Sequence, residues 1–295
     1  MSRRVEFFDA AGLRRDGRRA NELRETSLSI GTGTKSASPA IAQQQTNDDG
    51  AGAAPPPRAA AASGASSALS NAGAASAGGG HADGYAELTS ASTSVRALVF
   101  GPRQASLRDA RPDSAHVTCE VTALRRRGGG AARRARSLEL SALVIEAITP
   151  VLLLAQYPLS AIHIHVDVLQ SDGDEEVCCI NAASLALADA CIAMRDVVVA
   201  SQVCFLDGKH VVVDPTAEEL RSGCPRWIEA VFAHNPRLLA MLHEEGRYAR
   251  KDQLEDDAKD ALHAACLGAC SQAATAMLAA VREHTNAQLA VLEGK

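Results

Sequence analysis

The stretch LQSDGDEEVCCINAASLALADA, residues 169–190, reads as the end of a strand, a tight glycine turn and the start of an alanine-rich helix. A turn that leads into a helix N-terminus presents free backbone N–H groups and the positive end of the helix dipole, so it suits a bound phosphate. Here the position carries three consecutive acids, Asp174, Glu175 and Glu176. Two interpretations are open: acids that favour a helix N-terminus, or a phosphate site whose charge has been inverted.

The preceding segment, AIHIHVDVLQ at residues 161–170, alternates between apolar and polar residues and predicts a half-buried strand. Its apolar residues share one face, which places His163, His165 and Asp167 together on the other. A metal pair at the two histidines is conceivable, but we interpret them as facing solvent or a partner.

The remaining periodicities predict a mixture of strands and helices. A helix is expected at 137–156, starting at Ser137 and Glu139 and kinked by Pro150. Its predicted apolar face consists of Leu138, Val144, Ile145, Ile148 and Leu152. Further helices are predicted at 181–193 and 252–284. Strands are predicted at 27–30, 85–88, 95–100, 116–122, 197–206, 211–213, 227–232 and 238–242. This order indicates an α+β fold.

Residues 32–80 have a composition that cannot form a core. They are mostly Ala, Gly, Ser, Pro and Gln, with almost no large apolar side chain. Burial there cannot offset the roughly 1–2 kcal/mol of backbone entropy that each ordered residue costs, so we predict a disordered insertion. The single folded domain is then made of residues 1–31 and 81–295.

Charge and cysteine content exclude several classes of protein. The formal net charge of -5 argues against a protein that coats nucleic acid by bulk charge, although basic residues cluster at 14–19 and 124–136. The eight cysteines contain no C-x-x-C pair and no histidine at zinc-finger spacing, so we expect core thiols in a reducing compartment and no metal or cofactor. We expect no signal peptide, and no apolar run approaches the roughly 18 residues of a membrane span, so we expect a soluble intracellular protein that binds no membrane.

Several segments together resemble the RNase PH superfamily. They are LRRDGRRANELRE (13–25), ADGYAELTSASTSVRALVFGP (82–102), VDVLQSDG (166–173), INAASLALADACIAMRDVV (180–198) and FLDGKHVVVD (205–214). The chain looks most like the RNase PH-like ring subunits of the archaeal and eukaryotic RNA exosome. Among these it is most similar to the subunit that is phosphorolytic in archaea.

This resemblance implies a compact α+β domain of paired βαβ units. It also implies alternating heterodimers in a six-membered ring around a channel for single-stranded RNA. Active members of the family cleave the RNA 3′ end with inorganic phosphate and release nucleoside diphosphates.

Two family motifs for this chemistry are altered here. The family places G-G-T-R or G-G-T at the phosphate seat, whereas this chain has Gly173 followed by Asp174, Glu175 and Glu176. Carboxylates there repel phosphate. The family also carries two catalytic Asp six residues apart. The first is kept as Asp214, but Leu220 stands at the second, and the neighbouring Glu218 and Glu219 are shifted in register.

The arginines that the family uses for RNA are retained. Arg126 and Arg136 fall on two positions that grip phosphate and the RNA backbone, and Arg125 and Arg127 flank the first. Arg108 and Arg111 lie in a loop that faces the channel in this family. Because the family's stacking aromatics are not evident, contact with RNA is expected through the backbone alone and should be sensitive to salt.

The resemblance therefore predicts a non-catalytic structural and RNA-channel subunit of the RNA exosome, supporting 3′-to-5′ RNA processing and degradation, including rRNA processing and mRNA decay. It implies other RNase PH-like subunits, S1/KH-type cap subunits, a hydrolytic exoribonuclease and single-stranded RNA as partners, in the nucleus, nucleolus and cytoplasm. One alternative is an active phosphate-dependent 3′-exoribonuclease that uses Asp214 with Glu218 or Glu219. A second is a regulatory module in which the insertion is the functional part.

Four apolar residues have no evident cover in the sequence pattern: Leu98, Val99, Leu262 and Met277. We therefore expect the isolated chain to be poorly soluble and to form a heterodimer with another RNase PH-like subunit.

Overall fold

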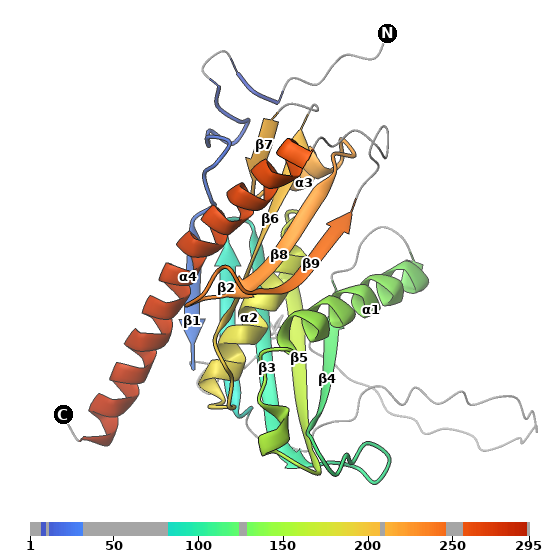
Figure 1. The fold of residues 1–295 in the computed structure, drawn as a ribbon, viewed down its shortest axis with the longest axis vertical. Coiled ribbons are helices and arrows are strands. Elements are labelled where there is room, and N and C mark those ends of the chain that lie inside the picture. Colours follow the sequence, from blue (N-terminus) through green and yellow to red (C-terminus); the bar gives the residue numbers. More distant parts are fainter. Residues whose placement is uncertain are drawn as a thin grey trace, which may run out of the picture. The chain divides into compact units, whose positions relative to one another are not determined.

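The larger of two β-sheets has five strands in the order β1-β2-β3-β5-β4 (Figure 1). Strands β4 and β5 are parallel, and the other neighbours are antiparallel. Helix α1 (Gly129–Ile148) connects the parallel pair, which makes a βαβ unit. The strands are β1 (Thr26–Ile30), β2 (Gly84–Ser90), β3 (Thr93–Gln104), β4 (His116–Thr122) and β5 (Ser160–Gln170).

The smaller sheet has four strands in the order β7-β6-β8-β9, and all its neighbours are antiparallel. Helix α2 (Glu175–Asp189) leads from the first sheet to the second, and the short α3 (Ala217–Leu220) follows β7. Helix α4 (Asp256–Leu292) packs on β6, β8 and β1. The strands are β6 (Val198–Leu206), β7 (His210–Val213), β8 (Arg226–Phe232) and β9 (Leu239–Glu245), and a 3-10 turn occupies Leu154–Gln156.

This computed structural model describes residues 7–9, 12–31, 82–123, 129–206, 210–245 and 256–293. The chain on either side of 34–81 belongs to one compact unit. The predicted insertion at 32–80 lies outside the described residues, and so do Arg125, Arg126 and Arg127.

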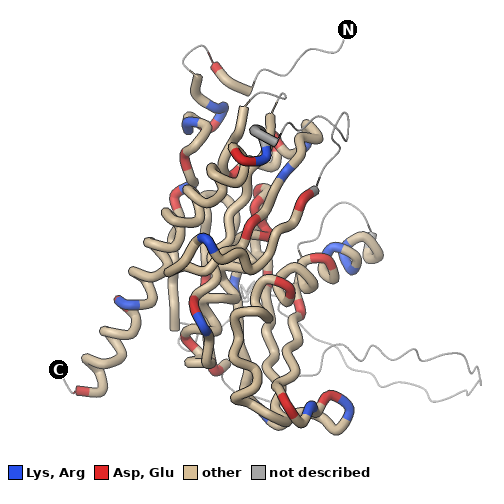
Figure 2. The backbone as a smooth tube through the Cα atoms, viewed as in Figure 1, with Lys and Arg blue, Asp and Glu red and all other residues tan. Residues whose placement is uncertain are grey.

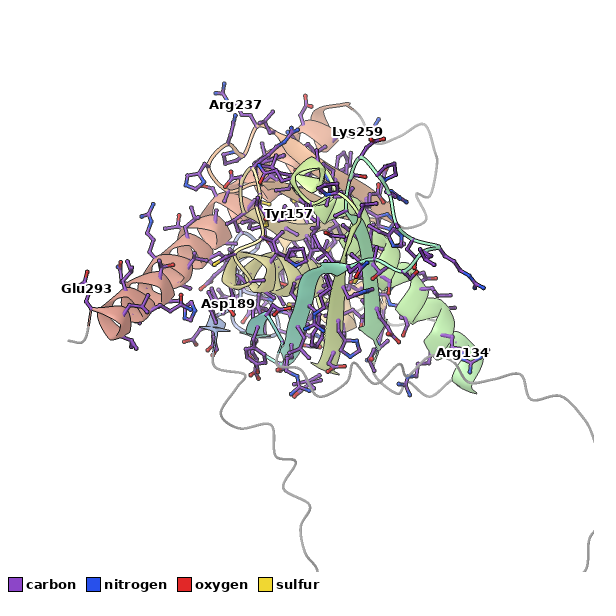
Figure 3. The ribbon with its side chains drawn as sticks, turned by 90° about the horizontal axis from the view of Figure 1, so that it is seen from below. Arg134, Tyr157, Asp189, Arg237, Lys259 and Glu293 are labelled. Atoms are coloured by element: carbon purple, nitrogen blue, oxygen red, sulfur yellow. The ribbon has the colours of Figure 1, made fainter. Side chains whose placement is uncertain are left out.

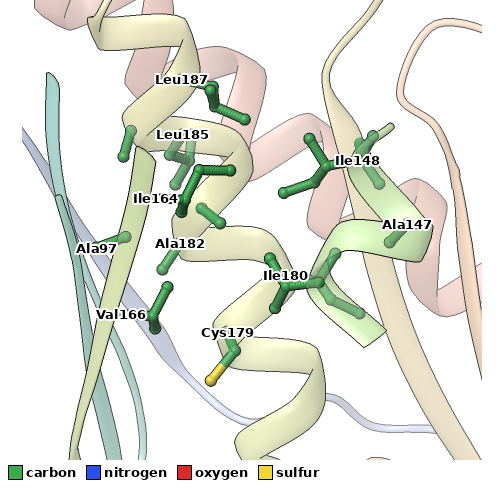
Figure 4. Packing of buried hydrophobic residues seen from close by; sticks show 14 of the residues in the cluster. Ala97, Ala147, Ile148, Ile164, Val166, Cys179, Ile180, Ala182, Leu185 and Leu187 are labelled. Carbon is green, nitrogen blue, oxygen red and sulfur yellow. The ribbon is translucent and has the colours of Figure 1, made fainter. Parts of the chain in front are cut away.

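Helix α2 is the centre of the core. Twelve of its fifteen residues are buried, including both of its N-terminal glutamates. Its alanines and cysteines allow close approach to Ile164 and Val166 on β5, while Ile180 faces Ile148 on α1 (Figure 4). An apolar helix between a sheet and a second helix has no solvent-facing side, which explains why its sequence is apolar almost all round.

The expected start of the first helix was wrong, whereas its predicted apolar face was right at Val144 and Ile148 and wrong at Leu138. Helix α1 begins at Gly129 rather than Ser137 and ends at Ile148, before Pro150, so there is no kink. Leu138, predicted on the apolar face, is 71% exposed. The buried residues of α1 are Leu140, Leu143, Val144, Ala147 and Ile148. The basic first two turns carry no apolar periodicity from which the start could be predicted.

The prediction for β5 is confirmed. Ile162, Ile164, Val166 and Val168 are buried, and His163, His165 and Asp167 lie on the other face. His163 contacts Thr118 at 2.5 Å, and Asp167 pairs with His165 at 3.2 Å and with Arg96 at 3.2 Å. The hydrogen bond that His165 donates to the Asp167 carboxylate raises the pKa of His165. No group of three or more metal-ligating side chains occurs among the described residues.

The structure corrects two expectations, one about uncovered apolar residues and one about membrane spans. Val99, Leu262 and Met277, expected to lack a cover, are each at most 2% exposed within this chain's own core. In addition, α4 from Lys259 to Leu292 is long and apolar enough, by length and composition, to cross a membrane. Its buried stripe includes Leu262, Cys266, Ala269, Cys270, Ala274 and Met277. The spacing of three and four residues is that of a helix packed on a core.

Gly84 offers a test of the packing between β2 and α2. A β-carbon at this position would lie 2.1 Å from the carbonyl oxygen of Ala186 and 2.6 Å from the nitrogen of Ala190. We expect Gly84→Ala to lower the free energy of unfolding by about 1–3 kcal/mol, because backbone atoms must move apart. The measurement is the midpoint of urea unfolding.

The matched control is Gly268→Ala in α4, where a β-carbon would meet nothing within 4 Å. It should stabilise the chain by about 0.5–1 kcal/mol through helix propensity. Equal effects of the two substitutions would contradict the close packing of β2 on α2.

Candidate functional site

The turn between β5 and α2 brings three acids into the interior. Gly173 has a φ of +103°, which favours glycine, and Asp174 is the N-cap residue of α2. Asp174, Glu175 and Glu176 are only 2%, 4% and 1% exposed. Burial of three carboxylates is costly unless each has a cationic partner, so the site is defined by what neutralises them.

Arg136 of α1 and Arg226 of β8 neutralise the two glutamates. The Nη2 atom of Arg136 lies 2.6 Å from Glu175 Oε1 and also contacts Glu176 Oε1. Arg226 Nη2 lies 2.6 Å from the same oxygen of Glu176. Although burial opposes ionisation, Arg226 and Arg136 hold the pKa of Glu176 below its usual value. The guanidinium of Arg136 is thus already matched by carboxylates of its own chain.

Asp174 is bound by a different set of groups. Its carboxylate accepts a hydrogen bond from the Thr93 hydroxyl, and the Cys178 thiol donates to Oδ2 at 3.4 Å. Arg24 Nη1 lies 3.4 Å from Asp174 Oδ1. Burial and the charge of Asp174 raise the pKa of the Cys178 thiol well above its usual value. Cys178 is therefore a core thiol and not a nucleophile.

Asp214 is also enclosed by arginines. It has a φ of +51° at the end of β7, and its Oδ2 accepts a hydrogen bond from the backbone N–H of Arg24 at 3.2 Å. Arg24 Nε lies 3.4 Å and Arg18 Nη1 3.6 Å from the same oxygen. Burial, together with the charge of Asp174, raises the pKa of Asp214 in spite of these arginines. A positive φ at a non-glycine residue is strained and is held by its surroundings.

An apolar residue occupies the position at which the family carries its second catalytic Asp. Leu220 packs against the turn, since a β-carbon at Gly173 would lie 3.1 Å from Leu220 Cδ1. The neighbouring Glu219 is buried and bound by Arg14, with Nη2 to Oε2 at 2.5 Å and Nε to Oε1 at 2.9 Å. Glu219 also closes a capping box with Thr216 at the start of α3. Glu218 pairs with Arg15 at the surface.

The predicted RNA-binding arginines do not lie together. Arg108 and Arg111 are exposed in the loop between β3 and β4, where Figure 2 shows both basic and acidic residues. That loop leads into β4, whose first residue pairs with the start of β5, whereas the acids follow the end of β5. The eleven residues of β5 therefore separate Arg108 and Arg111 from the acids by roughly 30 Å.

Four arginines of this site were not predicted as site residues: Arg14, Arg18, Arg24 and Arg226. The first three lie in the motif that carries the family resemblance, which indicated their importance without indicating a partner. Arg226 lies 50 residues from Glu176 and belongs to no local pattern, so nothing in the sequence points to it.

The chain is similar in sequence to known proteins. Residues 77–193 match the model of the 3′ exoribonuclease family, domain 1. The exosome complex component Rrp41 of Pyrobaculum calidifontis is 35% identical over 182 residues, which cover 59% of this chain and 72% of that protein. The mouse RRP41 is 33% identical over 190 residues, with 62% of this chain and 76% of that protein covered.

Solved structures show the same fold. Rice Rrp46 superposes with a TM-score of 0.65 at 17% identity, covering 91% of this chain and all of that one. An archaeal exosome core chain gives 0.63 at 16% identity, covering 90% and 92%. The predicted α+β fold of the RNase PH type is confirmed.

The ion pairs around Glu175 and Glu176 predict a large effect of removing one arginine. Arg136→Met keeps the length of the side chain but leaves two buried carboxylates with less cationic compensation. We expect a loss of about 3 kcal/mol in the free energy of unfolding at neutral pH. Arg134→Met is the control, since Figure 3 shows Arg134 at the outer end of α1, and no change is expected.

The stability difference between wild type and Arg136→Met depends on pH in a defined direction. The folded-state pKa of Glu176 is lowered from 4.5, so its ion pairs stabilise the fold above that pH and are lost as the pH falls through the folded value. The stability difference between wild type and Arg136→Met should therefore shrink in acid. A difference that is constant from pH 7 to pH 3 would contradict the assigned pairing.

Proposed function

This chain belongs to the RNase PH family of 3′ exoribonucleases, and we propose that it is a subunit of an exosome-type ring. In this proposal the subunit supports 3′-to-5′ RNA processing without performing phosphorolysis itself. The family membership rests on the Rrp41 relatives and the matching domain model. The non-catalytic role rests on what occupies the phosphate seat.

The observation that carries this proposal is the pairing of Glu175 and Glu176 with Arg136 and Arg226. An incoming phosphate would meet carboxylates that are buried within a few ångström of the same arginines. Phosphate would have to displace these charge-assisted bonds and then remain next to the displaced carboxylates. The arginines therefore stabilise the fold and are not free to receive a substrate anion.

A second observation comes from an unlinked motif. Proton transfer or metal binding by paired carboxylates needs two groups with defined separation, and Leu220 supplies none. Glu219 is committed to Arg14 and to the cap of α3, and Glu218 points to Arg15. Asp214 alone remains, and its carboxylate is held by Arg24 and Arg18.

The alternative function is an active phosphate-dependent exoribonuclease that releases nucleoside diphosphates. Asp214 favours it, because a buried carboxyl with a raised pKa is typical of an acid or base. It requires Glu218 or Glu219 to leave its arginine during the reaction. A purely regulatory role of the 32–80 insertion is distinguished by whether a chain without the insertion still assembles.

The proposed partners follow the family. They are other RNase PH-like subunits in a hetero-hexameric ring, S1/KH-type cap subunits, an associated hydrolytic exoribonuclease and single-stranded RNA. The proposed locations are the nucleus, nucleolus and cytoplasm. RNA contacts are assigned to Arg108 and Arg111, which are exposed, and to the basic run at 125–127.

The proposed function makes a prediction about catalysis. The chain, assembled with an RNase PH-like partner, is expected to release no nucleoside diphosphate from single-stranded RNA in the presence of inorganic phosphate and Mg²⁺. An archaeal exosome core is the positive control. Leu220→Asp should also be inactive, because the acids at the phosphate seat remain and catalytic groups act as a unit.

Diphosphate release by the unmodified assembly, abolished by Asp214→Asn, would establish the alternative and overturn the non-catalytic role. Release that survives Asp214→Asn would be assigned to the partner or a contaminant.

The proposed function also makes a prediction about RNA binding by the assembly. Replacing both Arg108 and Arg111 with Gln should weaken binding to single-stranded RNA and reduce the salt dependence of log K by about 1.4, or roughly 0.7 for each lost phosphate contact. Arg237→Gln, at an exposed position between β8 and β9, is the matched control. Fluorescence anisotropy at several salt concentrations measures both quantities, and equal slopes for all three proteins would exclude these contacts.

A further inference from the structure

Two cysteines from different elements meet on one face of the smaller sheet, and the proposed function uses neither. Cys204 lies in β6, and Cys224 lies in the turn between α3 and β8. Strands β6 and β8 are antiparallel neighbours (Figure 1), with Cys204 opposite Arg226, and the Phe205 N–H donates to the Pro225 carbonyl at 3.0 Å. Residues two apart along a strand share a face, so Cys224 is the diagonal neighbour of Cys204.

The two side chains are in contact. Cys224 packs against the apolar cluster that contains Cys204 and Phe7. The Cys204 thiol hydrogen-bonds to the sulfur of Cys224, so a short movement separates this contact from the roughly 2.05 Å of a disulfide bond. Gly223 directly precedes Cys224, and a β-carbon there would meet nothing within 4 Å. The turn therefore has room for that movement.

The two thiols differ in exposure and in acidity. Cys204 is 0% exposed, whereas Cys224 is half-buried and follows the exposed residues 221–223. The hydrogen bond from Cys204 lowers the pKa of Cys224 against the effect of burial, and Ser222 adds to the lowering. The same hydrogen bond, together with burial, raises the pKa of Cys204. An accessible, acidic cysteine beside a second thiol has the character of a redox-sensitive pair.

The other thiols of the chain lack one or more of these properties. Four are at most 2% exposed: Cys178, Cys179, Cys266 and Cys270. Burial raises the pKa of Cys119 to about 12. Cys191 is exposed, but its sulfur contacts a backbone carbonyl, at 3.6 Å. Among the described residues, access, a lowered pKa and a neighbouring thiol come together at Cys224.

We propose that Cys224 is an oxidation site for hydroperoxides and that Cys204 converts its oxidised form into a reversible disulfide. The Cys224 thiolate attacks one oxygen of hydrogen peroxide, and the O–O bond breaks. The sulfur becomes a sulfenic acid, while the departing hydroxide takes up the proton that the thiol released. The Cys204 sulfur then attacks the sulfenic sulfur, and its proton leaves with the hydroxyl group as water.

The sum of these steps is balanced. Two thiols and one hydrogen peroxide give one disulfide and two waters. In a reducing compartment, two molecules of a small thiol return both cysteines to the reduced form and become a disulfide themselves. The bond between Cys204 and Cys224 is therefore transient, as disulfides in such compartments usually are.

The disulfide would join β6 to the segment that follows α3. The Cys224 thiol already donates to the Glu219 carbonyl at 3.5 Å, and Arg14 binds the Glu219 carboxylate. Oxidation would thus fix the end of α3 to the smaller sheet beside the ion pair through which the N-terminal segment docks.

The test uses the full native chain and hydrogen peroxide. After exposure to a few equivalents of peroxide, the remaining thiols are alkylated, the chain is digested without reductant, and the peptides are identified by mass spectrometry. The expected product is a cross-linked pair of peptides carrying Cys204 and Cys224, two hydrogen atoms lighter than the sum of the reduced peptides. Dithiothreitol should restore both alkylatable thiols.

Two variants separate the two steps. Cys204→Ser keeps a hydrogen-bond donor but removes the second thiol, so the sulfenic acid should persist at Cys224 and be trapped there by dimedone. Cys224→Ser should abolish the cross-link and leave Cys204 reduced. Cys191→Ser is the matched control at an exposed thiol, and its cross-link should equal that of the wild type. The wild-type result keeps the test decisive if a variant fails to fold.

Three results would overturn the proposal. The first is a Cys224 thiol that remains fully alkylatable after peroxide, or that cross-links to a cysteine other than Cys204. The second is a cross-link that forms only in urea, which would mean that the native fold does not hold the two sulfurs together. The third is a dimedone adduct of Cys204→Ser at Cys191 and none at Cys224.

Discussion

The neutralisation of buried carboxylates by arginines is the constraint on which this structure depends. Five acids lie in the interior near the β5–α2 and β7–α3 turns, and five buried or largely buried arginines from three regions of the chain meet them. The acids are Asp174, Glu175, Glu176, Asp214 and Glu219, and the arginines are Arg14, Arg18, Arg24, Arg136 and Arg226. An uncompensated carboxylate there would cost several kcal/mol, so the N-terminal segment, α1 and β8 must dock together.

The sequence predicted the elements of the fold better than the contacts of the site. Strand β5 was predicted well, because alternation along a half-buried strand is a local property. Helix α1 was placed eight residues late, because its first turns are basic and glycine-rich and pack on nothing apolar. One of the two arginine partners of Glu176, Arg226, could not be predicted, since it reaches Glu176 through the pairing of β8 with β6 and not through any spacing in the chain.

The structure adds the surroundings of the three acids. The sequence left open whether they cap a helix or invert a phosphate site. All three are buried, and each meets an arginine of the same chain. Asp174 is the N-cap residue of α2 but makes no side-chain capping hydrogen bond, and its carboxylate is directed to Thr93, Cys178 and Arg24.

Carboxylates of the chain itself neutralise the arginines at the N-terminus of α2, so their charge is compensated without a bound anion. The N-terminus of α2 favours negative charge, and arginines placed around it need an anion for the same reason. Glu175 and Glu176 meet both requirements permanently, so the fold gains the stabilisation that a bound phosphate would otherwise supply only at saturating concentration. Arg108 and Arg111, which are exposed, lie in the loop at the other end of β5. The proposed binding of RNA is therefore separable from the centre that holds the fold together.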